Sequence, residues 1–162
     1  MKGGPIERIL LYVEASESSL TAARYAVVLA KTYGAEIHAV YVINEKLLEE
    51  LLRAKVFLEE EEVDLEQDLE ADGRRYLDAV SRLAKDKDVS ISSEILRGVV
   101  HREVIDKATQ VDASLIIIGE LGESVSRRDS FFDESEMILR LARCPVLSVK
   151  GDDFVRSLYD SI

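Results

Sequence analysis

The sequence of 162 residues has little of several residue types, and each shortage excludes a class of protein. It holds one cysteine, two prolines and no tryptophan. A single cysteine excludes a disulfide framework and fits a reducing compartment, so we expect a cytoplasmic protein. No stretch approaches the roughly 20 apolar residues of a membrane-spanning helix, and no basic segment followed by an apolar one opens the chain. We therefore expect neither secretion nor a membrane partner.

Basic residues are also scarce relative to acidic ones. The chain has 21 Lys and Arg against 32 Asp and Glu, which gives a net charge of −11. A field of this sign opposes docking on nucleic acid, so we expect no nucleic-acid partner. The acidity is local, because residues 45–72 hold 12 acidic and 3 basic side chains and so carry most of the net charge.

What the sequence does contain is an alternation of apolar strands and amphipathic helices. We predict strands at residues 9–13, 36–43, 89–96, 115–118 and 146–149. The first helix begins within Ser16–Ser19 and ends at Gly34, and further helices cover residues 104–111 and 134–143. Strands that alternate with helices predict an α/β fold with a single open, doubly wound, five-stranded parallel sheet and helices on both faces. The length fits one such domain over residues 1–150.

Two segments depart from the simple alternation. Residues 44–88 are too long for one crossover and carry leucines at helical spacing, so we expect an acidic helical segment there. Gly73, inside this segment, makes the helix prediction weaker at that position. This acidic segment would suit a basic protein partner held by charge. The tail, residues 151–162, places Phe154, Leu158 and Ile162 at i, i+4 and i+8, which predicts a short amphipathic helix.

The residues with most bearing on function follow the predicted strand 115–118. Gly119 and Gly122 come directly after Ile118, at the edge of the sheet where open α/β folds bind ligands. Glycines at this edge let backbone N–H groups approach a phosphate closely. The same spacing is also typical of an ordinary turn at the end of a strand.

With these glycines, an acidic residue after the first strand and a Cys-Pro-Val-Leu start to the last strand, the chain resembles the universal stress protein family up to Lys150. The resemblance implies the strand order 3-2-1-4-5 and a site for an adenine nucleotide, often with a divalent ion. Glu14 would take the place of the aspartate that holds adenosine in nucleotide-binding members. Val42 or Ile43, at the end of the second strand, would contact the base.

The phosphate-binding part of the family pattern is not matched. Nucleotide-binding members carry Gly followed by Ser or Thr nine residues after the second glycine, and this chain has Phe132 and Asp133 there. Phenylalanine lacks the backbone freedom of glycine. Asp133 either repels a phosphate or occupies the anion position itself as a helix cap. Arg127 and Arg128, in the same loop, would pair with a phosphate or, as we favour, face solvent.

These departures favour a non-enzymatic regulatory or stress-protective protein with a degenerate adenine-nucleotide site and no required cofactor. The alternative is an adenine-nucleotide binding protein or slow ATP hydrolase that holds ATP or AMP with Mg²⁺ in a modified loop. A third interpretation is an interaction module that acts through the acidic helices. The candidate binding residues, none of them catalytic, are Glu14, Val42, Ile118, Gly119, Gly122, Arg127, Arg128 and Asp133.

Other motifs predict no catalytic or metal site. The acidic run 68–73 matches the first half of a calcium-binding loop, but Ala79 stands at its twelfth position instead of glutamate. No Gly-Lys-Ser/Thr follows the glycines, and the chain has no Gly-x-Ser-x-Gly. We expect structural roles for His38, inside a predicted strand, and for Cys144, a small apolar residue before Pro145.

The two edges of the predicted sheet differ in composition. In the order 3-2-1-4-5 the edges are the strands 89–96 and 146–149. The strand 89–96 alternates polar and apolar residues, as a solvent-exposed edge does. The strand Val146–Val149 is apolar at all but one position, and an open apolar edge promotes aggregation. We predict a homodimer in which this strand meets its copy across a two-fold axis.

Overall fold

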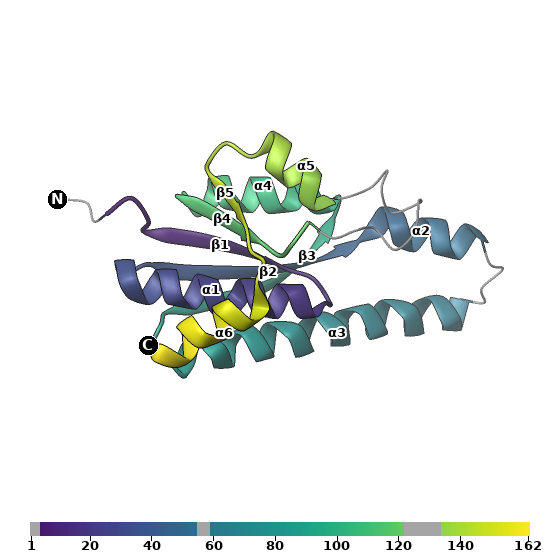
Figure 1. Cartoon of the computed structure of the whole chain (residues 1–162). Helices are drawn as coiled ribbons and strands as arrows, with labels where there is room; N and C mark the ends of the chain where they lie inside the picture. Colours follow the sequence, from purple (N-terminus) through teal and green to yellow (C-terminus); the bar gives the residue numbers. More distant parts are fainter. Residues whose placement is uncertain (1–3, 55–58, 122–133) are drawn as a thin grey trace.

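The protein folds into a five-stranded parallel sheet with helices on both faces (Figure 1). The computed structural model describes residues 4–54, 59–121 and 134–162, and only the backbone of residues 54 and 59–63. In chain order the elements are β1 (Arg8–Val13), α1 (Glu17–Tyr33), β2 (Glu36–Asn44), α2 (Glu45–Ala54), α3 (Glu59–Lys85), β3 (Ile91–Gly98), α4 (Val100–Gln110), β4 (Leu115–Ile118), α5 (Glu134–Leu141), β5 (Val146–Ser148) and α6 (Asp152–Ser161). The strand order β3-β2-β1-β4-β5 confirms the predicted sheet.

Two apolar layers hold the helices to the sheet. Alternate residues of a strand point to opposite faces, so β1 contributes Leu11 to one layer and Leu10 to the other. Helices α1, α3 and α6 cover the first face, and α4 and α5 cover the second (Figure 1). The central strands β1 and β4 are almost completely buried, as their continuous apolar runs predict. None of the described helices is both long and apolar enough to cross a membrane.

Helix α1 begins and ends where the sequence predicts. Ser16 caps its start, and the Ser16 hydroxyl accepts a hydrogen bond from the Ser19 N–H at 3.4 Å. Gly34 ends the helix in the left-handed conformation, with φ of 69°, which glycine adopts without steric cost. The residues that α1 buries against the sheet are mostly small, namely Ala22, Ala23, Ala26, Val27 and Ala30.

Helix α3 continues through Gly73, the position where the sequence gives the helix its weakest support. It runs without interruption from Glu59 to Lys85. A Cβ atom at position 73 would lie 2.6 Å from the Cδ1 atom of Tyr41 on β2. The missing side chain therefore lets the helix backbone approach the tyrosine ring, and Gly73 is a packing site inside a continuous helix.

Helix α6 buries a different stripe from the one that predicted it. Val155 and Tyr159 are 1% and 8% exposed and pack into the core with α1 and α3. The Tyr159 hydroxyl donates to the backbone oxygen of Leu83 at 2.7 Å, which satisfies its polar end. Phe154, by contrast, is 67% exposed. Both stripes have apolar residues four apart, so spacing alone could not identify the buried one.

The two edge strands differ as predicted. On β3 the residues Ser92, Ser93 and Glu94 are exposed, and Arg97 donates to Glu66 of α3 at 2.8 Å. Strand β5 has three residues, one fewer than predicted, and all three are half-buried. It pairs with β4 and stands at the edge of the described sheet.

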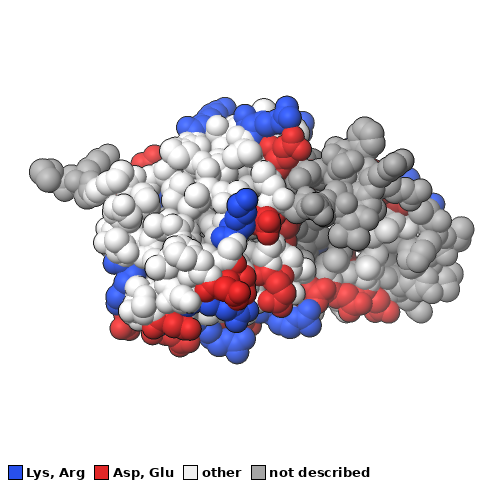
Figure 2. All heavy atoms as spheres, viewed as in Figure 1, with Lys and Arg blue, Asp and Glu red and all other residues white. Residues whose placement is uncertain are grey.

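Few charged side chains lie on the surface over β5. Figure 2, drawn in the same view as Figure 1, shows a mostly uncharged surface over β5, in the left half of the molecule, whereas α6 below it exposes Asp152, Asp153, Arg156 and Asp160. Charged groups lie along its right-hand border and below it. The net charge of −11 is therefore unevenly distributed over the surface.

Candidate functional site

The carboxyl ends of β1, β2 and β4 meet at the edge where the sequence predicts a ligand site. β1 pairs in parallel with β2 on one side and with β4 on the other. Glu14, Val42 and Gly119 therefore lie at neighbouring strand ends. Val42 and Ile118 are buried in the layer covered by α4 and α5, so they form the floor of the site. Four predicted residues lie outside the described part of the chain: Gly122, Arg127, Arg128 and Asp133.

Glu14 is exposed directly after β1, and its neighbours hold it from two directions. Its Oε1 atom accepts a hydrogen bond from the Tyr12 hydroxyl at 3.1 Å. Its backbone N–H donates to Ser19 Oγ at 2.7 Å, and its backbone oxygen accepts from the Ser16 N–H at 2.9 Å. The first turn of α1 thus fixes the backbone of Glu14, and Tyr12 orients its carboxylate.

Tyr12 is a site residue that the sequence did not reveal. Its side chain is buried in the same layer as Val42, and only its hydroxyl reaches the strand ends. Burial raises the pKa of the Tyr12 phenol well above its ordinary value, and the negative charges of Glu14 and Glu134 raise it further. The hydroxyl therefore stays protonated at neutral pH and donates to the carboxylate.

Gly119 is required by packing as much as by any ligand. A Cβ atom at this position would lie 2.9 Å from Ser18 Oγ and 3.2 Å from the Ser18 backbone, at the start of α1. The Gly119 backbone oxygen accepts a hydrogen bond from the Ser148 hydroxyl of β5 at 3.0 Å. The space freed by the absent side chain is therefore occupied by α1.

His101 and Glu134 join the starts of α4 and α5. Glu134 Oε2 lies 2.7 Å from His101 Nδ1 and accepts the backbone N–H of His101, also at 2.7 Å. Both side chains are largely buried. Val99, at the N-cap of α4, has no side-chain acceptor, so Glu134 supplies from another helix the cap that α4 lacks. No local pattern in the sequence reveals this cap.

A cavity of about 340 Å³ lies beside Gly119, between the start of α1, the end of β5 and the start of α6. Its lining residues are Glu17, Ser18, Thr21, Glu120, Val149, Lys150, Gly151, Asp152 and Arg156. Asp152 accepts hydrogen bonds at 2.7 Å from both Thr21 and Arg156, which lower the pKa of its carboxyl group. Both acidic and basic groups line this cavity, and the carboxylate of Asp152 already bonds to Thr21 and Arg156.

The groups that the described site offers to a ligand are mainly carboxylates. Glu14, Glu120 and Glu134 follow β1, follow β4 and begin α5, respectively. Carboxylates accept hydrogen bonds, so this edge suits a ligand with hydroxyl or amino groups and repels a free phosphate. In the part of the chain that the structure describes, no group of three or more His, Cys, Asp or Glu side chains could hold a metal ion.

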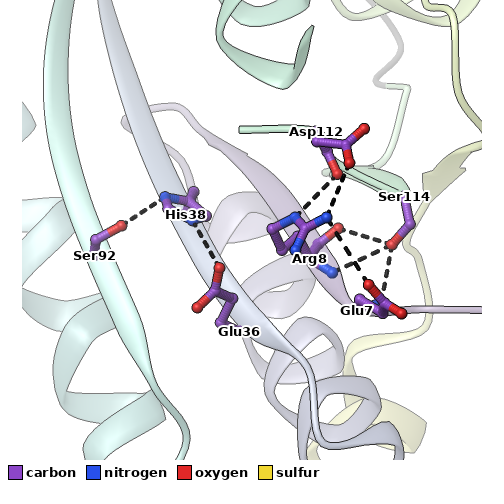
Figure 3. Close-up of polar contacts among 7 residues, drawn as sticks. All are labelled: Glu7, Arg8, Glu36, His38, Ser92, Asp112 and Ser114. Atoms are coloured by element: carbon purple, nitrogen blue, oxygen red, sulfur yellow. Dashed lines mark hydrogen bonds and ion pairs between the residues drawn. The ribbon is translucent and has the colours of Figure 1, made fainter. Parts of the chain in front are cut away.

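The opposite, amino end of the sheet is closed by a polar network around Ser114 and Arg8 (Figure 3). Ser114 Oγ accepts the backbone N–H groups of Glu7 at 3.0 Å and Arg8 at 3.3 Å, and lies 3.0 Å from the Arg8 backbone oxygen. The Arg8 guanidinium donates to the backbone oxygen of Asp112 at 3.1 Å and to its carboxylate at 3.0 Å. These side chains bond to one another and to the backbone.

His38 and Cys144 have surroundings that fit structural roles. His38 Nδ1 lies 2.8 Å from Ser92 Oγ, and Nε2 lies 3.4 Å from a Glu36 carboxylate oxygen (Figure 3). Cys144 is a half-buried free thiol, and burial raises the pKa of that thiol. A raised pKa leaves less of the reactive thiolate at neutral pH.

The comparison with known protein families identifies the family to which the chain belongs. The model described as "Universal stress protein family" matches residues 5–150. The chain belongs to the universal stress protein family.

Universal stress proteins of known sequence and structure resemble it over most of its length. Universal stress protein MJ0531 of Methanocaldococcus jannaschii is 30% identical over 156 residues, which cover 89% of this chain and 82% of that one. Universal stress protein YxiE of Bacillus subtilis is 26% identical over 145 residues, 88% of this chain and 98% of that one. A universal stress family protein of Burkholderia pseudomallei superposes with a TM-score of 0.71 at 23% identity, over 93% of this chain and 100% of that one.

Two solved universal stress proteins with the same fold carry nucleotides. One, in complex with cAMP, superposes with a TM-score of 0.63 at 18% identity over 89% of this chain and 96% of that one. The other, from Arabidopsis thaliana with AMP bound, gives a TM-score of 0.64 at 17% identity over 91% and 94%. At these identities the likeness establishes the fold alone.

Proposed function

We propose that this universal stress protein is a non-enzymatic regulatory or stress-protective homodimer whose adenine-nucleotide site has lost its phosphate-binding part. The observation that carries this proposal is the set of carboxylates at the strand ends, Glu14, Glu120 and Glu134. A nucleotide site needs backbone N–H groups and cations facing the phosphates. Here the first helical residue of α5, Glu134, is itself an anion and is tied to His101.

The sequence of residues 122–133, which lie between β4 and α5 along the chain, supports the same conclusion. Phe132 and Asp133 stand where nucleotide-binding relatives carry Gly and Ser or Thr. Asp133 places a carboxylate where the family pattern has an uncharged hydroxyl, and Glu134 follows it with a second carboxylate. Two unit charges about 4 Å apart interact by roughly 4 kcal/mol near a protein surface, so the added acids disfavour a polyphosphate strongly.

Titration calorimetry with ATP and AMP, each with and without Mg²⁺, tests this proposal. We expect no submillimolar binding and no release of phosphate from ATP. Submillimolar ATP binding that is lost in Gly122→Val, with unchanged thermal unfolding, would overturn the proposal. Gly119→Val is not a suitable probe, because its side chain would strike Ser18 and disturb the start of α1.

A variant that restores the family pattern provides a positive control. The double substitution Phe132→Gly with Asp133→Ser removes one carboxylate and returns the glycine and hydroxyl that the family uses. We expect ATP affinity to rise at least about tenfold, which corresponds to roughly 1.4 kcal/mol. Asp133→Asn, which removes only the charge, separates the electrostatic part of that gain. No gain in either variant would contradict the assignment of the lost function to these two positions.

A second candidate function is the binding of an adenine nucleotide through its nucleoside part. The orientation of Glu14 by Tyr12 favours it, because a held carboxylate accepts two ribose hydroxyls at low entropic cost. Binding of adenosine and AMP with similar affinity, lost in Glu14→Ala, would support this function. Binding of ATP in preference to both would instead favour the slow ATP hydrolase predicted as the alternative.

The homodimer is proposed from the edge strand β5. The backbone oxygen of Pro145 and the N–H of Val149 bond to β4. Because alternate residues of a strand bond to the same neighbour, the N–H and C=O groups of Val146 point to the open side. Three half-buried residues beside such groups suit a strand of a second copy.

Substitution with proline tests this edge, because proline removes a backbone donor. Val146→Pro removes an outward N–H and leaves the β4 ladder intact, so we expect a monomer with a near-native fold. Leu147→Pro removes an inward N–H and should lower stability whether or not a dimer forms. A wild-type monomer at micromolar concentration by analytical ultracentrifugation would exclude the homodimer.

The proposal also includes a cellular compartment and a protein partner. We place it in the cytoplasm, a setting in which the half-buried thiol of Cys144 stays reduced. A basic protein partner on the acidic segment, residues 44–88, stays a prediction that a pull-down with salt elution would test.

A further inference from the structure

Helix α6 lies outside the part of the chain that the family model matches. The match ends at residue 150, and α6 spans Asp152–Ser161. The family fold therefore does not account for this helix, and its role has to be sought in its own contacts. It stands next to β5 along the chain, with only residues 149–151 between the two elements.

The body of the protein holds α6 in a fixed position. Val155 and Tyr159 are buried, and the Tyr159 hydroxyl bonds to the backbone of α3. At the other end of the helix, Asp152 bonds to Thr21 of α1 at 2.7 Å. Lys87 Nζ lies 4.7 Å from the centre of the Tyr159 ring and donates to the last backbone oxygen at 2.9 Å. Apolar groups on the outer side of α6 are therefore presented on a rigid support.

The outer side of α6 carries an apolar stripe that is exposed at both ends and half-buried at Leu158 in the middle. Phe154, Leu158 and Ile162 lie on one side of the helix, four residues apart, and Phe154 and Ile162 are 67% and 39% exposed. Helix α5, which precedes β5, exposes Leu139 and Leu141 by 43% and 51%. Both helices that flank β5 along the chain thus show large apolar side chains to solvent.

From these observations we propose that the Phe154–Leu158–Ile162 stripe of α6 is part of the contact with a second copy of this chain. The inference rests on the homodimer through β5 proposed above and names the element that makes it stable. Strand β5 has three residues and is about 10 Å long at roughly 3.3 Å per residue. A stable interface buries about 800 Å² on each partner, so a contact between two such strands needs flanking surface.

The charge distribution identifies the occupant as a second copy. Each chain carries a net charge of −11, so two copies repel each other wherever acidic surfaces meet. The surface over β5 is mostly uncharged (Figure 2). On α6 the exposed charged residues are Asp152, Asp153, Arg156 and Asp160. At about 100° per residue they fall on a different side of the helix from the stripe. Two copies can therefore meet at β5 and the stripe without that repulsion. A two-fold contact brings the same patch from each chain together, and an uncharged apolar patch is complementary to itself.

The test compares dimer dissociation constants by analytical ultracentrifugation for the full chain and three variants. Phe154→Ser removes the most exposed side chain of the stripe, Val146→Pro removes an outward donor of β5, and Leu51→Ser is a matched control on α2, where Leu51 is 41% exposed. We expect Phe154→Ser to raise the dissociation constant at least about tenfold, in the range of a central interface aromatic. Leu51→Ser should leave it unchanged. Thermal unfolding of the variants, at a protein concentration below the dimer dissociation constant, checks that the fold of the monomer is kept.

Failure of this inference is distinguishable from failure of the homodimer. If wild type is a dimer that Val146→Pro dissociates and Phe154→Ser does not weaken, the dimer stands and the role of α6 is overturned. If wild type is a monomer, both are overturned and the stripe has a different occupant, such as another protein. If Leu51→Ser weakens the dimer as much as Phe154→Ser, the effect is not specific to α6 and the inference is equally overturned.

Discussion

The two ends of the parallel sheet use polar side chains in different ways. At the amino end, Ser114 and Arg8 bond to backbone groups and to a neighbouring acid, so the polar atoms serve the fold (Figure 3). At the carboxyl end, Tyr12 and His101 hold the carboxylates of Glu14 and Glu134 in place. The comparison shows that the carboxyl end, where open α/β folds bind ligands, holds an oriented carboxylate, Glu14, beside one that also caps a helix, Glu134.

The largest effect should come from filling the space at Gly119. In Gly119→Ala the new methyl group would overlap Ser18 at the start of α1, and we expect the free energy of unfolding to fall by about 2 kcal/mol. Gly4→Ala is the matched control near the amino end, where the nearest atom to a new Cβ is 3.8 Å away on Tyr33. Urea unfolding of both variants measures the difference in stability. Equal stabilities would show that Gly119 is packed no more tightly than Gly4.

The next effect should come from the amino end. In Ser114→Ala the backbone N–H groups of Glu7 and Arg8 lose their acceptor in a half-buried place, so we expect a loss of about 1.5 kcal/mol. Ser92→Ala removes an exposed hydroxyl that bonds to His38 and should cost less than about 0.5 kcal/mol. A loss in Ser114→Ala no greater than in Ser92→Ala would contradict the structural role assigned to the amino-end network.

A smaller effect, visible mainly at high pH, is expected at Tyr12. The raised pKa of its phenol means that above about pH 10 the unfolded chain loses a proton that the folded chain keeps. Ionisation then favours unfolding, and Tyr12 lowers stability by up to about 1.4 kcal/mol per pH unit until its folded pKa is reached. In Tyr12→Phe this contribution disappears, so the alkaline loss of stability should be shallower.

At neutral pH, Tyr12→Phe should cost about 1 kcal/mol for the lost hydrogen bond to Glu14. Tyr33→Phe is the control, because Tyr33 is 46% exposed. Identical pH profiles for wild type and Tyr12→Phe between pH 9 and 12 would refute the proposed environment of the phenol.

The smallest effect should come from the exposed pair of Arg8 and Asp112. Exposed ion pairs contribute about 0–1 kcal/mol and are screened by salt. We expect Asp112→Asn to lower stability by about 0.5 kcal/mol at low salt and by less at 1 M NaCl. An effect above 1 kcal/mol that salt does not reduce would contradict an exposed ion pair and would indicate another role for the Asp112 side chain.

The sequence predicts the sheet well because burial has a simple period along a strand. The continuous run at residues 115–118 and the alternation at 89–96 identified a central and an edge strand. Side-chain contacts between distant elements have no such period. The cap that Glu134 gives to α4 depends on how two helices lie, and the contact of Gly119 with Ser18 joins residues about a hundred positions apart.

For the same reason the sequence selected the correct region of the site and missed part of its chemistry. Glu14 and Gly119 lie at the strand ends because chain order and the parallel sheet place them there. Tyr12 and His101 act through tertiary contacts that no spacing reveals. The stripe of α6 was ambiguous in a further way, because two apolar stripes share one helix and only the fold decides which is buried.

The contact between Gly73 and Tyr41 has a consequence for comparing relatives. Since α3 lies on the tyrosine ring with no room for a methyl group, the residues at positions 41 and 73 constrain each other. A relative with a larger residue at 73 needs a smaller one at 41 to keep the same helix position. This pair can therefore serve as a marker in an alignment, separating relatives that carry the acidic helix at the same depth from those in which it is displaced.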